Sequence, residues 1–309
     1  MRSLTVALGD YGLTRPLKDG SVPLGRLKLD FVSVEPITAA MRRMVRGLDF
    51  DVCEMAFTTY LCAKALGKPI TALPVFLTRN FHHRAAVCTV ASGIASPRDL
   101  AGRAVAVNRG YTVTTGLWVR GILSREYGLD LDKVTWLPTD EEHVAEYRAP
   151  ANVDYSSRGK TVEELVLSGG CDAAVGDIRS SSPAIRPLIA NARDVGAASF
   201  RKTGIYPLNH AVVVKDALLE QDPALAAELV ALFETAKVRY LAHLARGAEL
   251  SAADQAAQEL GAVVGDPFPY GIDANRKALD AILDFADEQH VTPSRLRLDT
   301  LFAPLPAAA

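Results

Sequence analysis

The first eighty residues alternate between short apolar segments and segments of helical periodicity, and this alternation constrains the fold more than any other feature. Residues 4–8 and 27–32 are predicted strands. Pro36 begins a predicted helix with one apolar face, and a strand at 50–55 runs into a second helix that ends near Gly67. Strands and helices in this order predict an α/β protein with a parallel sheet and right-handed crossovers.

The length of the chain indicates more than one hydrophobic core. With 309 residues and 33.1 kDa, two domains of roughly 100 to 200 residues are expected. A second group of strands is predicted near 103–198, and segments on both sides of it complete the first sheet. This favours a lobe at 103–198 inserted into a discontinuous lobe formed by 1–102 plus 199–309, with hinge segments near 85–103 and 195–212.

The polar stretch 202–210 precedes the apolar run 211–214, which is predicted to be a buried strand. The polar residues are predicted to form the loop that leads into this strand, so His210 would lie at the mouth of a sheet. Ligands of open α/β folds bind at such positions, which makes Asn209 and His210 candidates for proton transfer or anion contact. A buried histidine that only caps the strand is the alternative.

Cationic and hydroxyl side chains gather at the ends of several predicted strands. Arginine binds carboxylates with paired hydrogen bonds, and helix starts offer backbone N–H groups, so these residues predict a site for a small anion with one or two carboxylates. A purely structural role is the alternative for these residues. Thr58 or Thr59 could cap a helix, and the loop around Arg15 could be an ordinary exposed loop. The candidates are Arg15, Glu54, Thr58, Arg79, Arg84, Thr114, Thr115, Asp177 and Arg179.

Local signals predict several other elements. Ser96 with Asp99, and Thr161 with Glu164, have the spacing of capping boxes. Residues 140–159 are polar, lack a clear period and are predicted to be a long surface excursion. Helices are predicted at 223–246, 251–260 and 275–290.

Composition and charge exclude several classes of protein. The net charge of −2 gives no electrostatic case for binding nucleic acid or a membrane surface. The first ten residues hold about five apolar side chains, too few for a signal peptide, so a cytoplasmic location is expected. The four cysteines show no metal-binding spacing and are predicted to be buried, and adjacent His82 and His83 would point to opposite faces of an extended segment. Neither a metal nor a cofactor is expected.

Several segments resemble known families. Leu100-Ala101-Gly102 and the segment 169–174 resemble type II periplasmic-binding proteins, which implies two lobes, each a mainly parallel sheet flanked by helices, with a ligand cleft between them. The chain also contains the segments Gly9-Asp10-Tyr11, Thr203 to His210, Ala236-Lys237, Pro269-Tyr270-Gly271 and Asn275-Arg276. Through these segments it resembles, more narrowly, the 4,5-dihydroxyphthalate decarboxylase family over nearly its whole length. Where that family commonly has Phe-Arg-His-Ser, this chain has Phe81-His82-His83-Arg84, a difference that bears on substrate preference.

This resemblance implies cofactor-independent decarboxylation of 4,5-dihydroxyphthalate to 3,4-dihydroxybenzoate and CO2, by protonation of a ring carbon in an Arg- and His-lined cleft between the lobes. Such a reaction needs an acid, a base near the phenol and a cationic clamp on the remaining carboxylate. His210 or His83 is the expected proton donor, and Glu54 or Asp177 the expected acceptor at the hydroxyls. The expected substrate-binding residues are Arg15, Arg79, Arg179, Thr58, Thr114, Thr115, Tyr206 and Asn209.

Three other functions are compatible with this fold. A solute-binding protein would share the cleft but lack chemistry, and the missing export signal argues against it. Another enzyme of the fold, such as a lyase resembling those of menaquinone biosynthesis, is the second. The third is the ligand-sensing domain of a regulator, although no helix-turn-helix segment precedes the first strand. Exposed helices near the C-terminus are compatible with a homo-oligomer.

Overall fold

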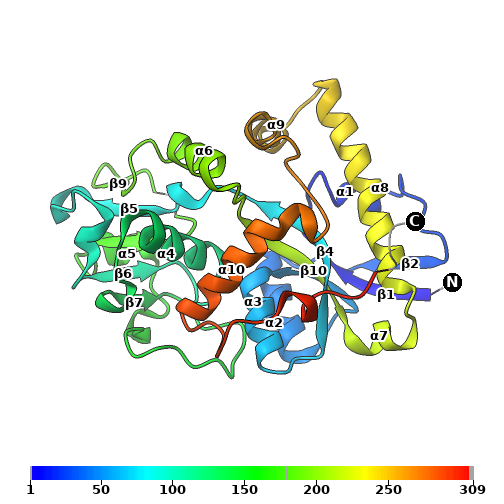
Figure 1. Cartoon of the computed structure of the whole chain (residues 1–309), viewed down its shortest axis with the longest axis horizontal. Coiled ribbons are helices and arrows are strands. Elements are labelled where there is room, and N and C mark those ends of the chain that lie inside the picture. The colour runs from blue at the N-terminus through cyan, green and yellow to red at the C-terminus, as the bar shows by residue number, and fades with distance from the viewer. Residues whose placement is uncertain (1, 179, 306–309) are drawn as a thin grey trace. The chain divides into compact units, whose positions relative to one another are not determined.

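The computed structural model describes residues 2–178 and 180–305 (Figure 1). Contacts divide the chain into two compact units. Unit 1 comprises Met1–Arg79, Leu208–Leu279 and Arg297–Ala309, and unit 2 comprises Asn80–Pro207 and Asp280–Leu296. The division differs from the expected boundary at 102/103, because strand β5 (Ala86–Thr89) pairs with two strands of unit 2.

The sheet of unit 1 has, within the described residues, the strand order β2-β1-β3-β10-β4. Strand β1 runs parallel to β2 and β3, whereas β10 runs antiparallel to β3 and β4. Because β10 runs in the opposite direction, its first residues meet the carboxyl ends of β3 and β4. The strands are β1 (Arg2–Ala7), β2 (Leu27–Phe31), β3 (Val52–Ala56), β4 (Ile70–Arg79) and β10 (Leu208–Lys215).

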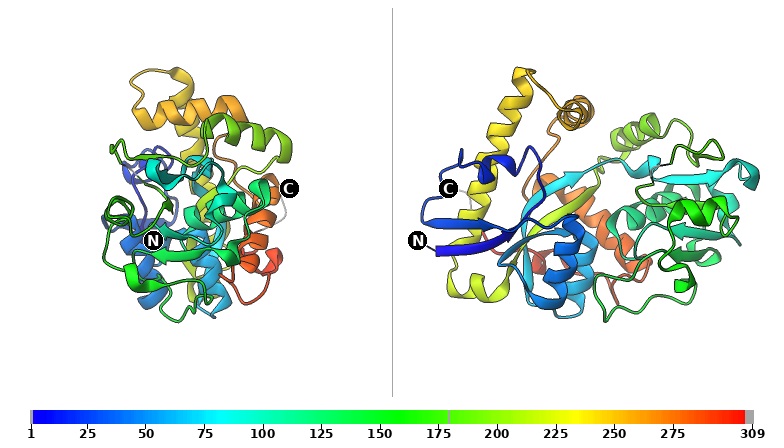
Figure 2. Two further views of the ribbon diagram at one scale, coloured as in Figure 1. Left: turned by 90° about the vertical axis from the view of Figure 1, so that its left-hand side faces the viewer. Right: turned by 180° about the vertical axis from the view of Figure 1, so that it is seen from behind.

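The helices of unit 1 pack on this sheet through their apolar faces. In α2 the predicted apolar residues Met41, Met44 and Val45 are buried. Along α8, which can be followed in Figures 1 and 2, Leu229 and Phe233 join one core with Val6 of β1. The helices are α1 (Arg15–Lys18), α2 (Ile37–Gly47), α3 (Phe57–Ala65), α7 (Asp216–Gln221), α8 (Leu225–Arg246), α9 (Ala252–Val264) and α10 (Arg276–Glu288), which continues into unit 2.

Strand β4 lies at one edge of the unit 1 sheet. Its pairing with β10 is irregular, and Pro74, which cannot donate a ladder hydrogen bond, falls in that irregular part. Other segments lie along the strand, because Ala303 N donates to Ala72 O at 2.9 Å and Gly271 N donates to Pro74 O at 2.8 Å. The edge is therefore partly covered by the chain itself.

Unit 2 contains the second sheet, with the described strand order β7-β6-β8-β5-β9. Strand β6 runs parallel to β7 and β8, and β5 runs antiparallel to β8 and β9. Each sheet is thus mixed, with one strand opposed to its neighbours. The elements are β5, β6 (Ala104–Val107), β7 (Thr135–Pro138), β8 (Ala173–Val175), β9 (Ile185–Pro187), α4 (Thr114–Tyr127), α5 (Val162–Leu167) and α6 (Ala192–Thr203).

Short 3-10 helices complete the described chain. Two of them bear on the predictions, because Ser96 and Asp99 form the predicted capping box at the start of η3, and His82 lies in η1. The prediction of an extended segment at His82 and His83 is therefore wrong. The seven are η1 (His82–Arg84), η2 (Val90–Ser92), η3 (Pro97–Leu100), η4 (Leu131–Lys133), η5 (Tyr155–Ser157), η6 (Asp273–Asn275) and η7 (Leu298–Thr300).

Other local predictions have mixed outcomes. The capping box of Thr161 and Glu164 is confirmed, and all four cysteines are buried and free. Asn209 and His210 belong to strand β10 rather than to the loop before it, because their segment already pairs with β4. The excursion at 140–159 is not all surface, since Glu142 and His143 are buried.

A stability prediction follows from Asp254 near the start of α9. Its carboxylate is 5% exposed and accepts hydrogen bonds from Tyr240 Oη at 2.7 Å and Ser251 Oγ at 2.7 Å. Burial raises the pKa of Asp254, but the hydrogen bonds outweigh burial and lower the pKa to about 2. We expect Asp254→Asn to lower the free energy of unfolding by about 1 to 3 kcal/mol at neutral pH.

This difference should depend on pH. Since the folded pKa lies below the unfolded one, the stabilisation is complete above about pH 4 and is lost as pH falls toward about 2. Urea unfolding across this range measures it, with the exposed Asp273→Asn as control. A loss of stability that is equal at every pH would contradict the role given to the ionised carboxylate.

Candidate active site

A buried carboxylate near the end of β3 organises the candidate active site. Glu54 is 0% exposed. It lies two residues after Val52, so both side chains point to the same face of the sheet, where Val52 joins the core. A charge in such surroundings is costly unless hydrogen-bond donors surround it.

Two segments of unit 1 supply donors to Glu54. Tyr11 Oη donates to Glu54 Oε1 at 2.9 Å, and Gly9 N donates to Oε2 at 2.8 Å. The third partner is His210 on β10, whose Nδ1 lies 2.6 Å from Oε1. Both carboxylate oxygens are therefore engaged by the protein, and the three contacts fix the plane of the carboxylate.

His210 owes its position to the antiparallel strand. It pairs with Ala56 at the end of β3 and with Thr78 near the end of β4, and the register of β10 against β4 shifts on both sides of it. Such irregularities re-aim side chains and recur beside active sites. With Glu54 accepting, Nδ1 is assigned as the donor, which leaves Nε2 as the nitrogen that Glu54 does not use. The side chain of His210 is 19% exposed.

The turn after β1 delivers Tyr11 and the Gly9 amide. A Cβ atom at position 9 would lie 2.4 Å from the Tyr11 ring, so only glycine fits there. Burial, followed by the charge of Glu54, raises the pKa of Tyr11, and the phenol therefore stays protonated as a donor. Tyr11 was absent from the predicted site residues, although its motif Gly9-Asp10-Tyr11 was part of the family resemblance.

Four other predicted site residues belong to unit 1. Arg79 is 8% exposed, and its Nη1 donates to Asn275 Oδ1 at 2.6 Å and, more weakly, to Pro269 O at 3.4 Å. Thr58 is buried in the first turn of α3, but the N-cap residue is Ala56, so the alternative that Thr58 caps this helix is wrong. Arg15 is exposed on α1 and Asn209 is half-buried on β10.

Those of the remaining predicted residues that the structure describes belong to unit 2. His83 is 3% exposed, and its Nε2 lies 3.0 Å from Glu126 Oε2. Asp177 is exposed after β8, Thr114 is buried and Thr115 half-buried at the start of α4. Tyr206 packs on Phe81 with ring centroids 5.4 Å apart. Arg179 lies outside the described residues.

The predicted anion site before α4 is partly filled by the chain itself. Tyr111 N and Thr112 N donate to the carboxylate of Glu142, at 2.6 and 3.0 Å. Thr112 Oγ1 also donates to Glu142 Oε2, at 2.6 Å, and Tyr155 Oη to Oε1, at 2.7 Å. These contacts explain why Glu142 is buried rather than part of a surface excursion.

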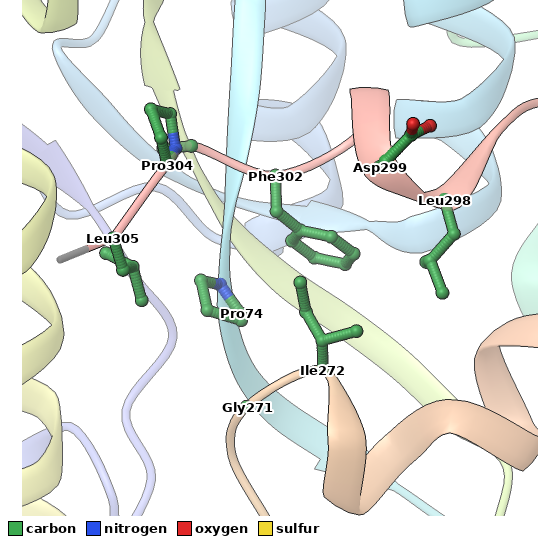
Figure 3. Close-up of a pocket in the computed structure, with 9 residues that line it drawn as sticks. Pro74, Gly271, Ile272, Leu298, Asp299, Phe302, Pro304 and Leu305 are labelled. Carbon is green, nitrogen blue, oxygen red and sulfur yellow. The ribbon is translucent and has the colours of Figure 1, made fainter. Parts of the chain in front are cut away.

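A pocket of about 530 Å³ lies elsewhere in unit 1 (Figure 3). Apolar residues such as Pro74, Ile272 and Phe302 line most of it, and none of the predicted site residues does. Among the described residues, no group of three or more His, Cys, Asp or Glu side chains could hold a metal ion. None of the helices in the described ranges is both long and apolar enough to span a membrane.

Two curated proteins are similar to this chain in sequence. A 4,5-dihydroxyphthalate decarboxylase of Comamonas testosteroni is 28% identical over 97% of this chain and 96% of its own length. A 4,5-dihydroxyphthalate decarboxylase of Pseudomonas putida is 31% identical over 56% of this chain and 70% of its own length. No family model matches the chain.

Solved structures are similar in fold. The periplasmic aliphatic sulphonate binding protein SsuA from Escherichia coli superposes with a TM-score of 0.60 at 14% identity, over 100% of this chain and 94% of that one. The desulfurization enzyme DSZB superposes with a TM-score of 0.56 at 16% identity, over 98% and 97% of the two chains. The predicted periplasmic-binding-protein-like fold is thereby confirmed, and this fold occurs in binding proteins and enzymes alike.

Proposed function

Because this chain belongs to the 4,5-dihydroxyphthalate decarboxylase family, we propose that it is a carboxy-lyase that converts 4,5-dihydroxyphthalate into 3,4-dihydroxybenzoate and CO2 without a cofactor. The observation that carries the proposal is the pairing of Glu54 with His210 at 2.6 Å. A buried carboxylate behind an imidazole is a common arrangement for a proton donor. A solute-binding protein, the alternative, has no need of such a pair.

In the first step the imidazolium form of His210 transfers its Nε2 proton to the ring carbon that bears the departing carboxylate. The electron pair for the new C–H bond comes from the ring, and the hydroxyl para to that carbon stabilises the resulting positive charge. Glu54 keeps Nδ1–H in place both before and after the transfer. The neutral imidazole is then left hydrogen-bonded to Glu54.

In the second step the bond between this carbon and the carboxylate breaks. Its electron pair returns to the ring, which regains aromaticity, and the carboxylate leaves as CO2. His210 recovers a proton from solvent, so each turnover consumes one proton and releases one CO2. The carboxylate that remains on the ring leaves with the product.

Glu54 has a different role in this proposal from the one expected from sequence. It was an expected acceptor at the substrate hydroxyls, but it is 0% exposed and both its oxygens accept hydrogen bonds from the protein. These contacts favour a carboxylate that orients His210 rather than one that touches the substrate. The clamp of Arg15, Arg79 and Arg179 stays a prediction.

The proposal is tested by mixing the purified protein with 4,5-dihydroxyphthalate and following CO2 and 3,4-dihydroxybenzoate by chromatography, with and without a chelator. We expect turnover in both conditions. Turnover that the chelator abolishes would contradict the cofactor-free mechanism. Thermal stabilisation by the acid without turnover would instead indicate a binding protein.

A further inference from the structure

We infer that Tyr11 is a positioning residue of this enzyme, whose hydroxyl holds Glu54 in the orientation that directs His210 toward the substrate. The inference deepens the proposed decarboxylation and rests on it for the identity of the reaction. Tyr11 is not assigned any contact with substrate. It acts through Glu54, and its effect can be measured in the resting protein.

The geometry around Glu54 shows that the hydroxyl of Tyr11 helps to orient the carboxylate. Tyr11 Oη and His210 Nδ1 share one oxygen, Oε1, at 2.9 and 2.6 Å. The other oxygen, Oε2, is held by Gly9 N at 2.8 Å. Rotation of the carboxylate out of this plane would break all three contacts, so the tyrosine and the glycine amide together fix the direction from which Glu54 meets the imidazole.

The turn that carries Tyr11 is itself fastened. Thr14 Oγ1 donates to Gly9 O at 2.7 Å and accepts from Tyr11 N at 3.0 Å. Lys18 Nζ donates to Leu8 O and Gly9 O, each at 3.0 Å. The Tyr11 hydroxyl is therefore held in place before substrate binds, as a group that supports a reacting residue must be.

The charged and titratable groups around Tyr11 and Glu54 are consistent with this role. His210 faces Glu54 from β10. The pKa of Tyr11 is raised mainly by burial, then by the charge of Glu54 and its hydrogen bond, and least by the charge of Glu35. Burial raises the pKa of the neighbouring Cys53 thiol, which stays neutral. Tyr11 consequently remains a protonated hydrogen-bond donor throughout the neutral range.

The kinetic test is Tyr11→Phe, which removes only the hydroxyl. We expect kcat to fall about 10- to 100-fold with little change in KM, the size of effect for a lost hydrogen bond to a charged group. Tyr60→Phe is the matched control, since Tyr60 also donates to the chain, at Leu301 O, but is not connected to Glu54.

A second measurement separates this inference from the proposed function. In resting protein with isotope-labelled histidine, NMR follows the Nδ1 proton of His210 without any substrate. Tyr11→Phe should shift that resonance, whereas Tyr60→Phe should leave it unchanged. Unaltered His210 signals in Tyr11→Phe would overturn the inference, whether or not the protein decarboxylates. A shift in a protein that shows no turnover would uphold the positioning role and refute the proposed reaction.

Discussion

His210→Ala is expected to abolish turnover of 4,5-dihydroxyphthalate while its binding stays nearly unchanged. In the proposed mechanism His210 is the acid that protonates the ring carbon, and a positioned acid contributes about 10²- to 10⁴-fold to a rate. The side chain is 19% exposed at the end of a strand, so removing it leaves the sheet contacts of β10 intact. Chromatography measures the loss of kcat, and calorimetry with the substrate measures binding.

A matched histidine variant makes this result specific. His290 is exposed and has a left-handed backbone with φ of 56°, which asparagine tolerates, so His290→Asn should keep full turnover. Turnover by His210→Ala equal to that of the unmodified protein would remove His210 from the mechanism. Loss of both binding and turnover would mean that His210 contacts the substrate as an anchor rather than as an acid.

Glu54→Gln is expected to lower kcat by about 10²- to 10⁴-fold, the range over which a positioned acid acts. Glutamine has the shape of glutamate but replaces one acceptor oxygen with an NH2 group that can only donate. In the native protein Gly9 N and Tyr11 Oη both donate to the carboxylate of Glu54. The NH2 group of the glutamine therefore either faces one of these donors, or donates to His210, whose Nδ1 must then accept. In the second case the ring carries its proton on Nε2 alone, so the imidazolium that the proposed mechanism requires cannot form while Nδ1 accepts.

Stability separates a mechanistic loss from unfolding in this variant. Because the amide leaves a buried donor unsatisfied, Glu54→Gln should also lose about 1 to 3 kcal/mol in the free energy of unfolding. Chemical unfolding and circular dichroism measure this, with Glu228→Gln, at a half-buried partner of Arg26, as the control. Full activity in a folded Glu54→Gln variant would show that the carboxylate does not assist His210.

Several elements of both units could be predicted from the sequence, because their signals are local. Apolar spacing identified α2 through Met41, Met44 and Val45, and the capping box identified η3 through Ser96 and Asp99. Such signals depend on residues three or four positions apart. The position of His210 at the edge of a sheet could also be predicted from a local signal, because a polar stretch directly precedes an apolar run there.

Contacts between distant segments could not be predicted in this way. Nothing near Tyr11 in the sequence shows that its hydroxyl reaches Glu54. Nothing near Glu142 shows that its buried carboxylate accepts hydrogen bonds from the N–H groups of Tyr111 and Thr112. The direction of β10 is likewise set by pairing with β3 rather than by its own residues. Helix α6 was missed because few of its side chains are buried, so the sequence shows little apolar periodicity there.

The covered edge of the unit 1 sheet bears on how the protein behaves at high concentration. An uncovered edge strand offers a row of backbone donors and acceptors to which another chain can add, and this is a common route to aggregation. On β4 the carbonyl oxygens of Ala72 and Pro74 already accept hydrogen bonds, from Ala303 N and Gly271 N. Pro74 also has no N–H to donate, so fewer backbone groups remain available to another chain. These contacts thus make the edge less available to another chain, and shortening the chain before Ala303 would expose a surface prone to self-association.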